Sequence, residues 1–279
     1  MQQTMNHTFS PEEPFDPMQR RLQLERRRTA EELAAFETFT KRVEDVPTNR
    51  VAPTFGPSVL TNQSQGGGLE LIRKAYCSTI MDVAHFGEEY GNEYAEDVIE
   101  EFGSTAAAAL LENGSLTAQT KRLILDAAAD SRASRTALLD IIDVETESVR
   151  VAATNLRPIA DELATIADVA FQNESFGALD GYRARMDVLA DQVVSAAERR
   201  QADLHDHRTR TAFSRNVVGL PCYLYQGFEP TFPILSFIAS LGDQINTIQQ
   251  DIAQAVSRYE TEYNPSSSCE IDTRRRTES

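Results

Sequence analysis

A histidine and two glutamates lie close together in the segment HFGEEY, residues 85–90. Histidine and carboxylates are common metal ligands, so His85, Glu88 and Glu89 form a weak candidate metal site. Their spacing matches no established ligand pattern, and a chain with 43 acidic residues brings such neighbours together by chance. The alternative is that His85, Phe86, Tyr90 and Tyr94 pack between helices. A ligand- or metal-dependent enzyme in the bundle core, centred on His85, Glu88, Glu89 and Tyr90, is the third functional hypothesis.

The sequence contains no G-x-S-x-G, no H-E-x-x-H and no phosphate-binding loop. Its three cysteines, Cys77, Cys222 and Cys269, fit neither a disulfide framework nor a paired zinc motif. We therefore predict a protein that is not an enzyme and uses no cofactor.

Five arginines near the start form a possible basic patch: Arg20, Arg21, Arg26, Arg27 and Arg28. Such a patch could bind nucleic acid, and a nucleic-acid-associated regulator is the second hypothesis. Glutamates interleave with the arginines and offer ion pairs along a helix, which favours an ordinary solvated helix face.

The formal net charge is −16, and lysine occurs only as Lys41, Lys74 and Lys121. An acidic surface that uses Arg in place of Lys is typical of adaptation to molar salt, where a Debye length of about 3 Å screens the self-repulsion. We expect a halophilic protein. The N-terminus lacks the apolar core of a signal peptide, and no apolar run is long enough to cross a membrane, so we expect a cytoplasmic protein.

The central part of the chain, residues 116–213, predicts a long antiparallel, coiled-coil-like hairpin of two helices. Apolar residues recur every seven positions in its first half, and turn formers at residues 174–177 precede a second apolar stripe. The rows are Ile142, Val149, Leu156 and Leu163, then Leu179, Met186 and Val193. Pro158 breaks or kinks the first helix, and the unchanged phase of the stripe favours a kinked continuous helix.

Residues 231–263 predict a final helix with the cleanest heptad stripe in the chain. The stripe is either a wall of an internal bundle or an interaction seam with a partner or a second copy. Its candidate seam residues are Ile238, Leu241, Ile245, Ile248, Ile252 and Tyr259.

The predicted fold is all-α, an elongated helical bundle. Its segments are a flexible arm (1–16), an N-terminal helix (17–46), a linker (47–68), a bundle (69–263) and a disordered tail (264–279).

The most distinctive local sequence resembles a family of uncharacterised haloarchaeal proteins defined by a domain of unknown function. The resemblance lies in Tyr76, Thr79, Met81, Val83, His85, Phe86, Glu88, Glu89, Tyr90 and Gly91, in Glu101, Phe102 and Gly103, and in the later Arg200-Gln201 and Tyr223-Leu224-Tyr225. It implies a haloarchaeal source and supplies no activity, ligand or catalytic residue. The leading hypothesis is a non-enzymatic protein–protein interaction or scaffold module that associates, with itself or a partner protein, through helical stripes.

Overall fold

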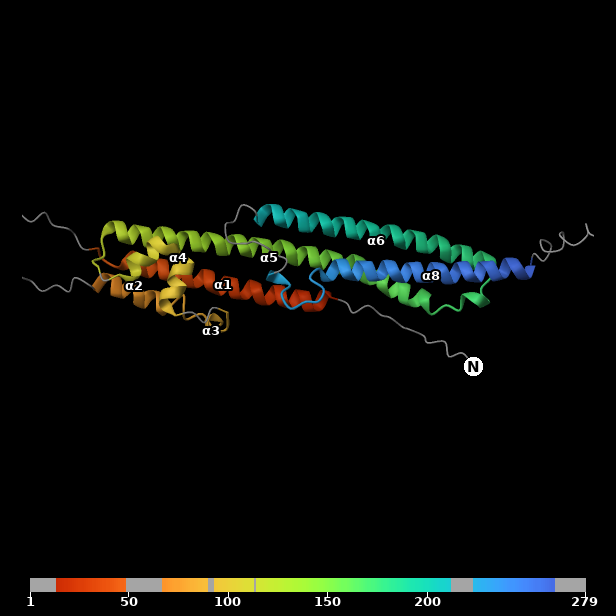
Figure 1. Cartoon of the computed structure of the whole chain (residues 1–279), viewed down its shortest axis with the longest axis horizontal. Helices are drawn as coiled ribbons and strands as arrows, with labels where there is room; N and C mark the ends of the chain where they lie inside the picture. The colour runs from red at the N-terminus through yellow and green to blue at the C-terminus, as the bar shows by residue number, and fades with distance from the viewer. Residues whose placement is uncertain (1–13, 49–66, 90–92, 113, 212–222, 264–279) are drawn as a thin grey trace, which may run out of the picture. The chain divides into compact units, whose positions relative to one another are not determined.

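The structure, a computed structural model, describes residues 14–48, 67–89, 93–112, 114–211 and 223–263. The side chains of residues 88–89, 207–211 and 262–263 lie outside this description. All secondary-structure elements in the described residues are helices, and no strand occurs among them. They are α1 (Phe15–Asp45), α2 (Gly67–Cys77), α3 (Phe86–Glu89), α4 (Tyr94–Leu111), α5 (Ala118–Ala167), η1 (Phe171–Asn173), α6 (Phe176–Thr211) and α8 (Pro233–Tyr263) (Figure 1). The predicted all-α class is confirmed.

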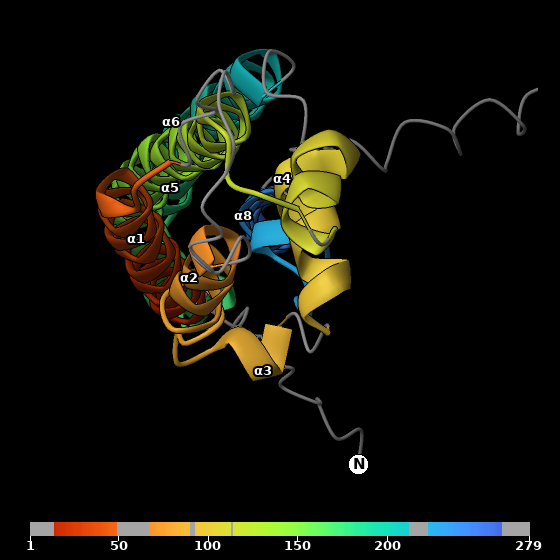
Figure 2. The ribbon, with the colours of Figure 1, turned by 90° about the vertical axis from the view of Figure 1, so that its left-hand side faces the viewer.

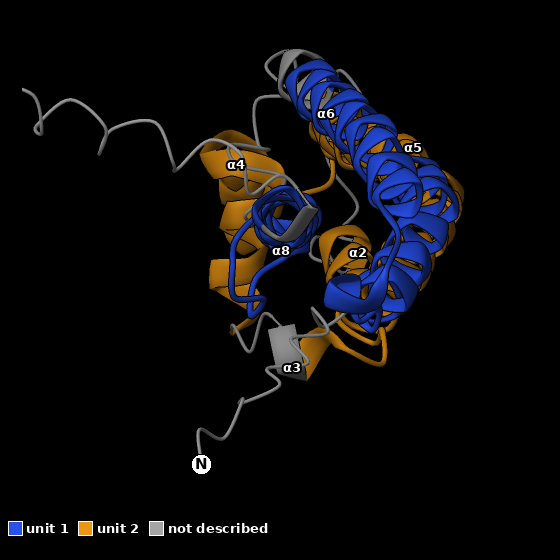
Figure 3. Ribbon diagram, turned by 90° about the vertical axis from the view of Figure 1, so that its right-hand side faces the viewer, with its two compact units in different colours: residues 1–19, 147–213, 218–279 blue, residues 20–146, 214–217 orange. Residues whose placement is uncertain are grey.

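The chain divides into two compact units (Figure 3). Unit 1 comprises residues 1–19, 147–213 and 218–279, and unit 2 comprises residues 20–146 and 214–217. This division crosses the predicted segment boundaries, because α1 and α5 each contribute one part to each unit. Heptad patterns mark which face of a helix is buried but not which core buries it.

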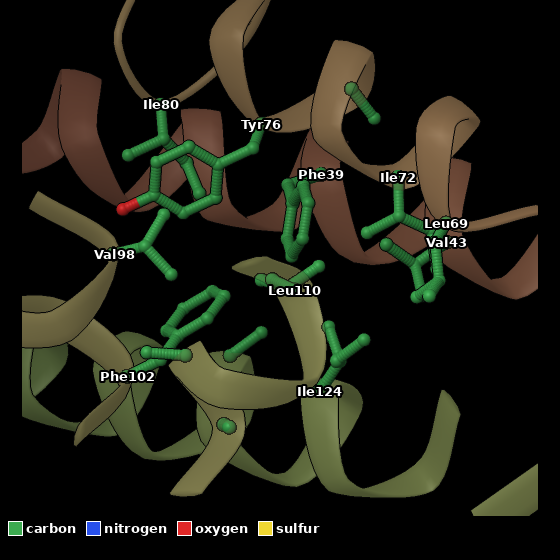
Figure 4. Packing of buried hydrophobic residues seen from close by; sticks show 14 of the residues in the cluster. Phe39, Val43, Leu69, Ile72, Tyr76, Ile80, Val98, Phe102, Leu110 and Ile124 are labelled. Atoms are coloured by element: carbon green, nitrogen blue, oxygen red, sulfur yellow. The ribbon is translucent and has the colours of Figure 1, made fainter. Parts of the chain in front are cut away.

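Unit 2 is built around a core of aromatic and aliphatic side chains from α1, α2, α4 and α5 (Figure 4). Tyr76 is fully buried, with ring centroids 5.6 Å from Phe39 and 5.4 Å from Phe102. α2 lies beside α1 in two perpendicular views (Figures 1 and 2). The segment predicted as an N-terminal helix before a linker is therefore part of the unit 2 core.

Helix ends in unit 2 are held by capping groups. Thr117 caps α5, since its Oγ1 accepts a hydrogen bond from the Thr120 backbone N–H at 3.1 Å. The Lys121 ammonium donates to the backbone oxygens of Glu44 and Val46 at the end of α1, at 2.6 and 2.8 Å. These contacts tie the start of α5 to the end of α1.

In unit 1, α5 and α6 run antiparallel. Arg185 on α6 contacts Glu162 on α5, and Arg200 on α6 donates to Ser148 on α5 at 2.9 Å. The two residue numbers sum to nearly the same value in each pair, as antiparallel neighbours require. α5 continues through Pro158, in agreement with the predicted continuous helix.

The first residues of α1 also belong to unit 1. Phe15 is fully buried with its ring centroid 5.3 Å from that of Phe237 on α8, and Arg157 bonds Asp16 at 2.5 Å. The predicted flexible arm therefore extends too far, because Phe15 finds an aromatic partner that lies 222 residues later in the chain. Residues 1–13 of the arm, and most of the predicted linker and tail, lie outside the described residues.

Candidate functional site

A buried histidine in unit 2 faces two carboxylates from α1. His85 is 4% exposed, its Nε2 lies 2.9 Å from Glu32 Oε1, and its Nδ1 lies 3.5 Å from Glu31 Oε2. The side chains of the other two predicted ligands, Glu88 and Glu89, lie outside the described residues, as does Tyr90. Among the side chains that are described, no group of three or more His, Cys, Asp or Glu residues could hold a metal ion.

Arg135 on α5 extends this contact into a network across three helices. Its Nε donates to Glu32 at 3.0 Å, and its two terminal nitrogens donate to the carboxylate of Glu101 on α4 at 2.5 and 2.8 Å. The guanidinium also lies 4.9 Å from the ring centroid of Phe36. A bidentate pair of this kind is directional, so Arg135 sets the relative positions of α1, α4 and α5 within unit 2.

A second buried polar pair lies in the same unit. The Tyr76 hydroxyl donates to Asp97 Oδ2 at 2.6 Å. Burial raises the pKa of both side chains above their usual values, because an apolar environment penalises the charged forms of a phenol and a carboxyl. Burial also raises the pKa of the neighbouring Tyr94 to about 12. Tyr76 is therefore a neutral donor near neutral pH.

The network borders a small cavity of about 20 Å³, lined by Glu32, Ala35, Phe36, Ile80, Val83, Phe86, Asp97, Glu101 and Arg135. That volume suits about one water molecule. Several polar groups converge on it, so a bridging water is the occupant that its size and chemistry fit.

The predicted basic patch is partly neutralised by carboxylates. Arg21 pairs with Glu25 at 2.9 Å, and Arg26 contacts Asp143 on α5 at 2.6 Å. The hydrogen bond to Asp143 raises the pKa of Arg26. The remaining members of the patch differ in exposure: Arg20 and Arg27 are exposed, whereas Arg28 is half-buried. The arrangement resembles a solvated helix face more than a continuous cationic surface.

The predicted interaction seam on α8 lies inside unit 1. Five of its six residues are at least 95% buried, namely Ile238, Leu241, Ile245, Ile248 and Ile252. Tyr259 is half-buried, and its ring centroid is 5.9 Å from that of Phe176 on α6. The stripe packs against α6 of the same chain, which decides between the two alternatives in favour of an internal wall. For the five buried residues the hypothesis of a seam with a partner is wrong, because their apolar surface is already covered.

An open groove of about 590 Å³ lies between α5 and α6. Its lining residues are Thr154, Asn155, Ile159, Val188, Asp191, Gln192, Ser195, Ala196 and Arg199. Val188 is 45% exposed, and Asp191 and Arg199 are both exposed. Within the described part of the chain, neither of these charged side chains forms an ion pair or a side-chain hydrogen bond. A smaller groove of about 340 Å³ lies between α6 and α8.

Sequence reasoning missed both the network and the groove. Arg135 lies one heptad before Ile142 in the buried row of α5, and a charged residue in such a row needs a buried partner. That signal could have identified Arg135, although not Glu32 or Glu101 as its partners. The groove residues could not be identified from the sequence, because exposed positions on a helix need not follow the periodic pattern of apolar residues that marks a buried face.

Of the comparisons with known proteins, one identifies a family. None of the helices in the described ranges is long and apolar enough to span a bilayer. No curated protein and no solved structure matches the chain. Residues 13–249 match the family described as "Domain of unknown function (DUF7260)". Because this match covers most of the sequence, the chain belongs to the DUF7260 family.

Proposed function

We propose that this protein is a halophilic cytoplasmic protein that acts as a non-enzymatic protein–protein interaction module. The observation that carries the proposal is the open groove along α5 and α6 of unit 1. An elongated groove between two helices fits a third helix, which is a common mode of recognition.

The lining chemistry supports a protein partner. Val188, which is 45% exposed, supplies apolar surface, while Asn155 and Gln192 supply hydrogen-bonding groups. Apolar contact area surrounded by polar groups is the usual composition of a non-obligate protein interface. The two charged residues, Asp191 and Arg199, would fix the orientation in which a partner binds.

The halophilic part of the proposal is supported by the charge balance. A net charge of −16 with only three lysines is favourable where salt screens repulsion between carboxylates. In a less saline solvent the same charge would oppose compaction.

The proposal is tested by affinity capture of the tagged full-length chain from a lysate of its native cell in about 1 M KCl, where charged surfaces are screened within about 3 Å. Protein and nucleic acid are quantified together. We expect a protein at a fixed molar ratio, a second untagged copy included, and no stoichiometric nucleic acid.

Two variants identify the surface. Val188→Arg places a charge in the groove and should release the partner. Val144→Arg on α5 makes the same change at a residue that is 38% exposed and outside the groove lining, and it should retain the partner. Equal capture by both variants would remove the groove from the proposal, and recovery of the chain alone would contradict the function.

A further inference from the structure

The exposed side of α6 carries two opposite charges placed symmetrically about a small residue. Asp191 and Arg199 are eight positions apart, about 12 Å along the helix axis, and Ser195 lies midway between them. All three residues line the groove and all three are exposed. The charges have no ion-pair partner among the residues that the structure describes.

This placement of opposite charges is compatible with a two-fold symmetric contact. In such an interface the same patch occurs on both subunits, and residue i meets j while j meets i. If two α6 helices run antiparallel with their axis at Ser195, Asp191 of each copy lies opposite Arg199 of the other. A symmetric contact therefore forms two Asp191–Arg199 ion pairs, one on each side of the axis.

We propose that a second copy of this chain docks on the groove, with the two α6 helices antiparallel about a two-fold axis near Ser195. This inference rests on the proposed interaction function and names its partner. The same symmetry pairs Val188 of one copy with Ala202 of the partner subunit, so the exposed valine is covered by another apolar residue. The resulting layer contains α5 and α6 from each copy.

Steric features of the groove favour close approach of the helices. Ser195 and Ala196 have small side chains at the crossing point. Asp191, Ser195 and Arg199 are spaced by four residues and form one ridge on α6, and ridges of this kind interdigitate in the commonest class of helix packing.

Sedimentation equilibrium of the full chain tests the proposal, at the lowest KCl concentration that retains full helicity. We expect a monomer–dimer equilibrium in the wild type. Asp191→Arg places like charges opposite each other twice per dimer and should weaken association by about tenfold or more. Arg199→Asp should do the same. The double variant Asp191→Arg, Arg199→Asp restores opposite charges and should return the dissociation constant to within about threefold of the wild type.

A matched control exchanges another pair on the same helix. Asp180 and Arg183 form an exposed ion pair at 3.1 Å outside the groove lining, and the variant Asp180→Arg, Arg183→Asp should leave association unchanged. A monomeric wild type overturns the inference; the proposed function then stands only if a different protein is captured through a contact that Val188→Arg abolishes. A dimer that is insensitive to Asp191→Arg also overturns the groove as its interface.

Discussion

Replacing Arg135 by Met removes the guanidinium that joins α1, α4 and α5 in unit 2, while keeping an unbranched stem. The wild-type side chain makes three hydrogen bonds, at 3.0, 2.5 and 2.8 Å, to the carboxylates of Glu32 and Glu101. The side chains of these two glutamates are only 12% and 16% exposed. Breaking a buried ion pair by removing one partner costs about 3–5 kcal/mol, because the remaining charge stays buried. Since some solvent contact remains here, we expect about 3 kcal/mol.

Hydrogen exchange measured by mass spectrometry localises this loss, because it reports the opening of each segment of a protein separately. A loss of about 3 kcal/mol corresponds to exchange about 100-fold faster, at about 1.4 kcal/mol per factor of ten. The increase should be confined to peptides of unit 2, including those of α4. Arg135→Lys retains a charge but not the bidentate geometry and should give an intermediate loss.

Arg122→Met on the same helix is the matched control. The Arg122 side chain is 85% exposed, and its variant should change stability by no more than about 0.5 kcal/mol. If Arg135→Met accelerated exchange no more than this control, the network would not be a structural link and the reasoning would be refuted.

Three further predictions follow from buried and charged groups. Tyr76→Phe removes the donor to Asp97 and should cost about 1–3 kcal/mol near neutral pH. Burial raises the pKa of Asp97, so above that pKa the folded protein carries the free-energy cost of a buried carboxylate. As the pH falls through the pKa, the carboxylate is protonated and this cost disappears. The destabilisation caused by Tyr76→Phe should therefore become smaller at low pH. Urea denaturation at several pH values measures this, and a loss independent of pH would contradict it. Ile245→Asp buries an unpaired charge in unit 1 and should destabilise the fold by about 4 kcal/mol or more. Circular dichroism should show reduced helicity for this variant, whereas Asn246→Asp on the exposed face of the same helix should keep the wild-type helicity. Lowering KCl from about 2 M to about 0.01 M lengthens the Debye length to about 30 Å and should reduce wild-type helicity; full helicity at low salt would argue against halophilic adaptation.

Local sequence signals predicted the helices well because their causes are local. The continuous phase of the apolar stripe correctly predicted a helix through Pro158. The α8 stripe predicted a buried face, which the structure confirms. Which surface covered that face was not predictable, since an internal neighbour and a second copy require the same pattern.

Long-range contacts were the part that the sequence did not reveal. His85 was singled out together with Glu88 and Glu89, yet its described neighbours Glu31 and Glu32 lie more than 50 residues earlier. Nothing near His85 in the sequence indicates that α1 passes beside it. The groove on α6 was missed for a related reason. Its charged residues look like ordinary surface residues in the sequence, and only the structure places them beside a groove.

A cysteine on the proposed two-fold axis gives the most direct test of self-association through the groove. Helix axes that pack about 8–10 Å apart, with Cα atoms about 2.3 Å from each axis, leave facing Cα atoms about 3.4–5.4 Å apart. That separation overlaps the range of about 4.4–6.8 Å that a disulfide spans. The variant is Ser195→Cys in a chain whose Cys77, Cys222 and Cys269 are replaced by Ser.

Under mild oxidation we predict rapid and nearly complete conversion of the Ser195→Cys chain to a covalent dimer on a non-reducing gel. Asp180→Cys in the same background is exposed on α6 but lies off the proposed axis, and it should remain largely monomeric. A Ser195→Cys chain that cross-linked no faster than the Asp180→Cys chain would contradict self-association through this groove.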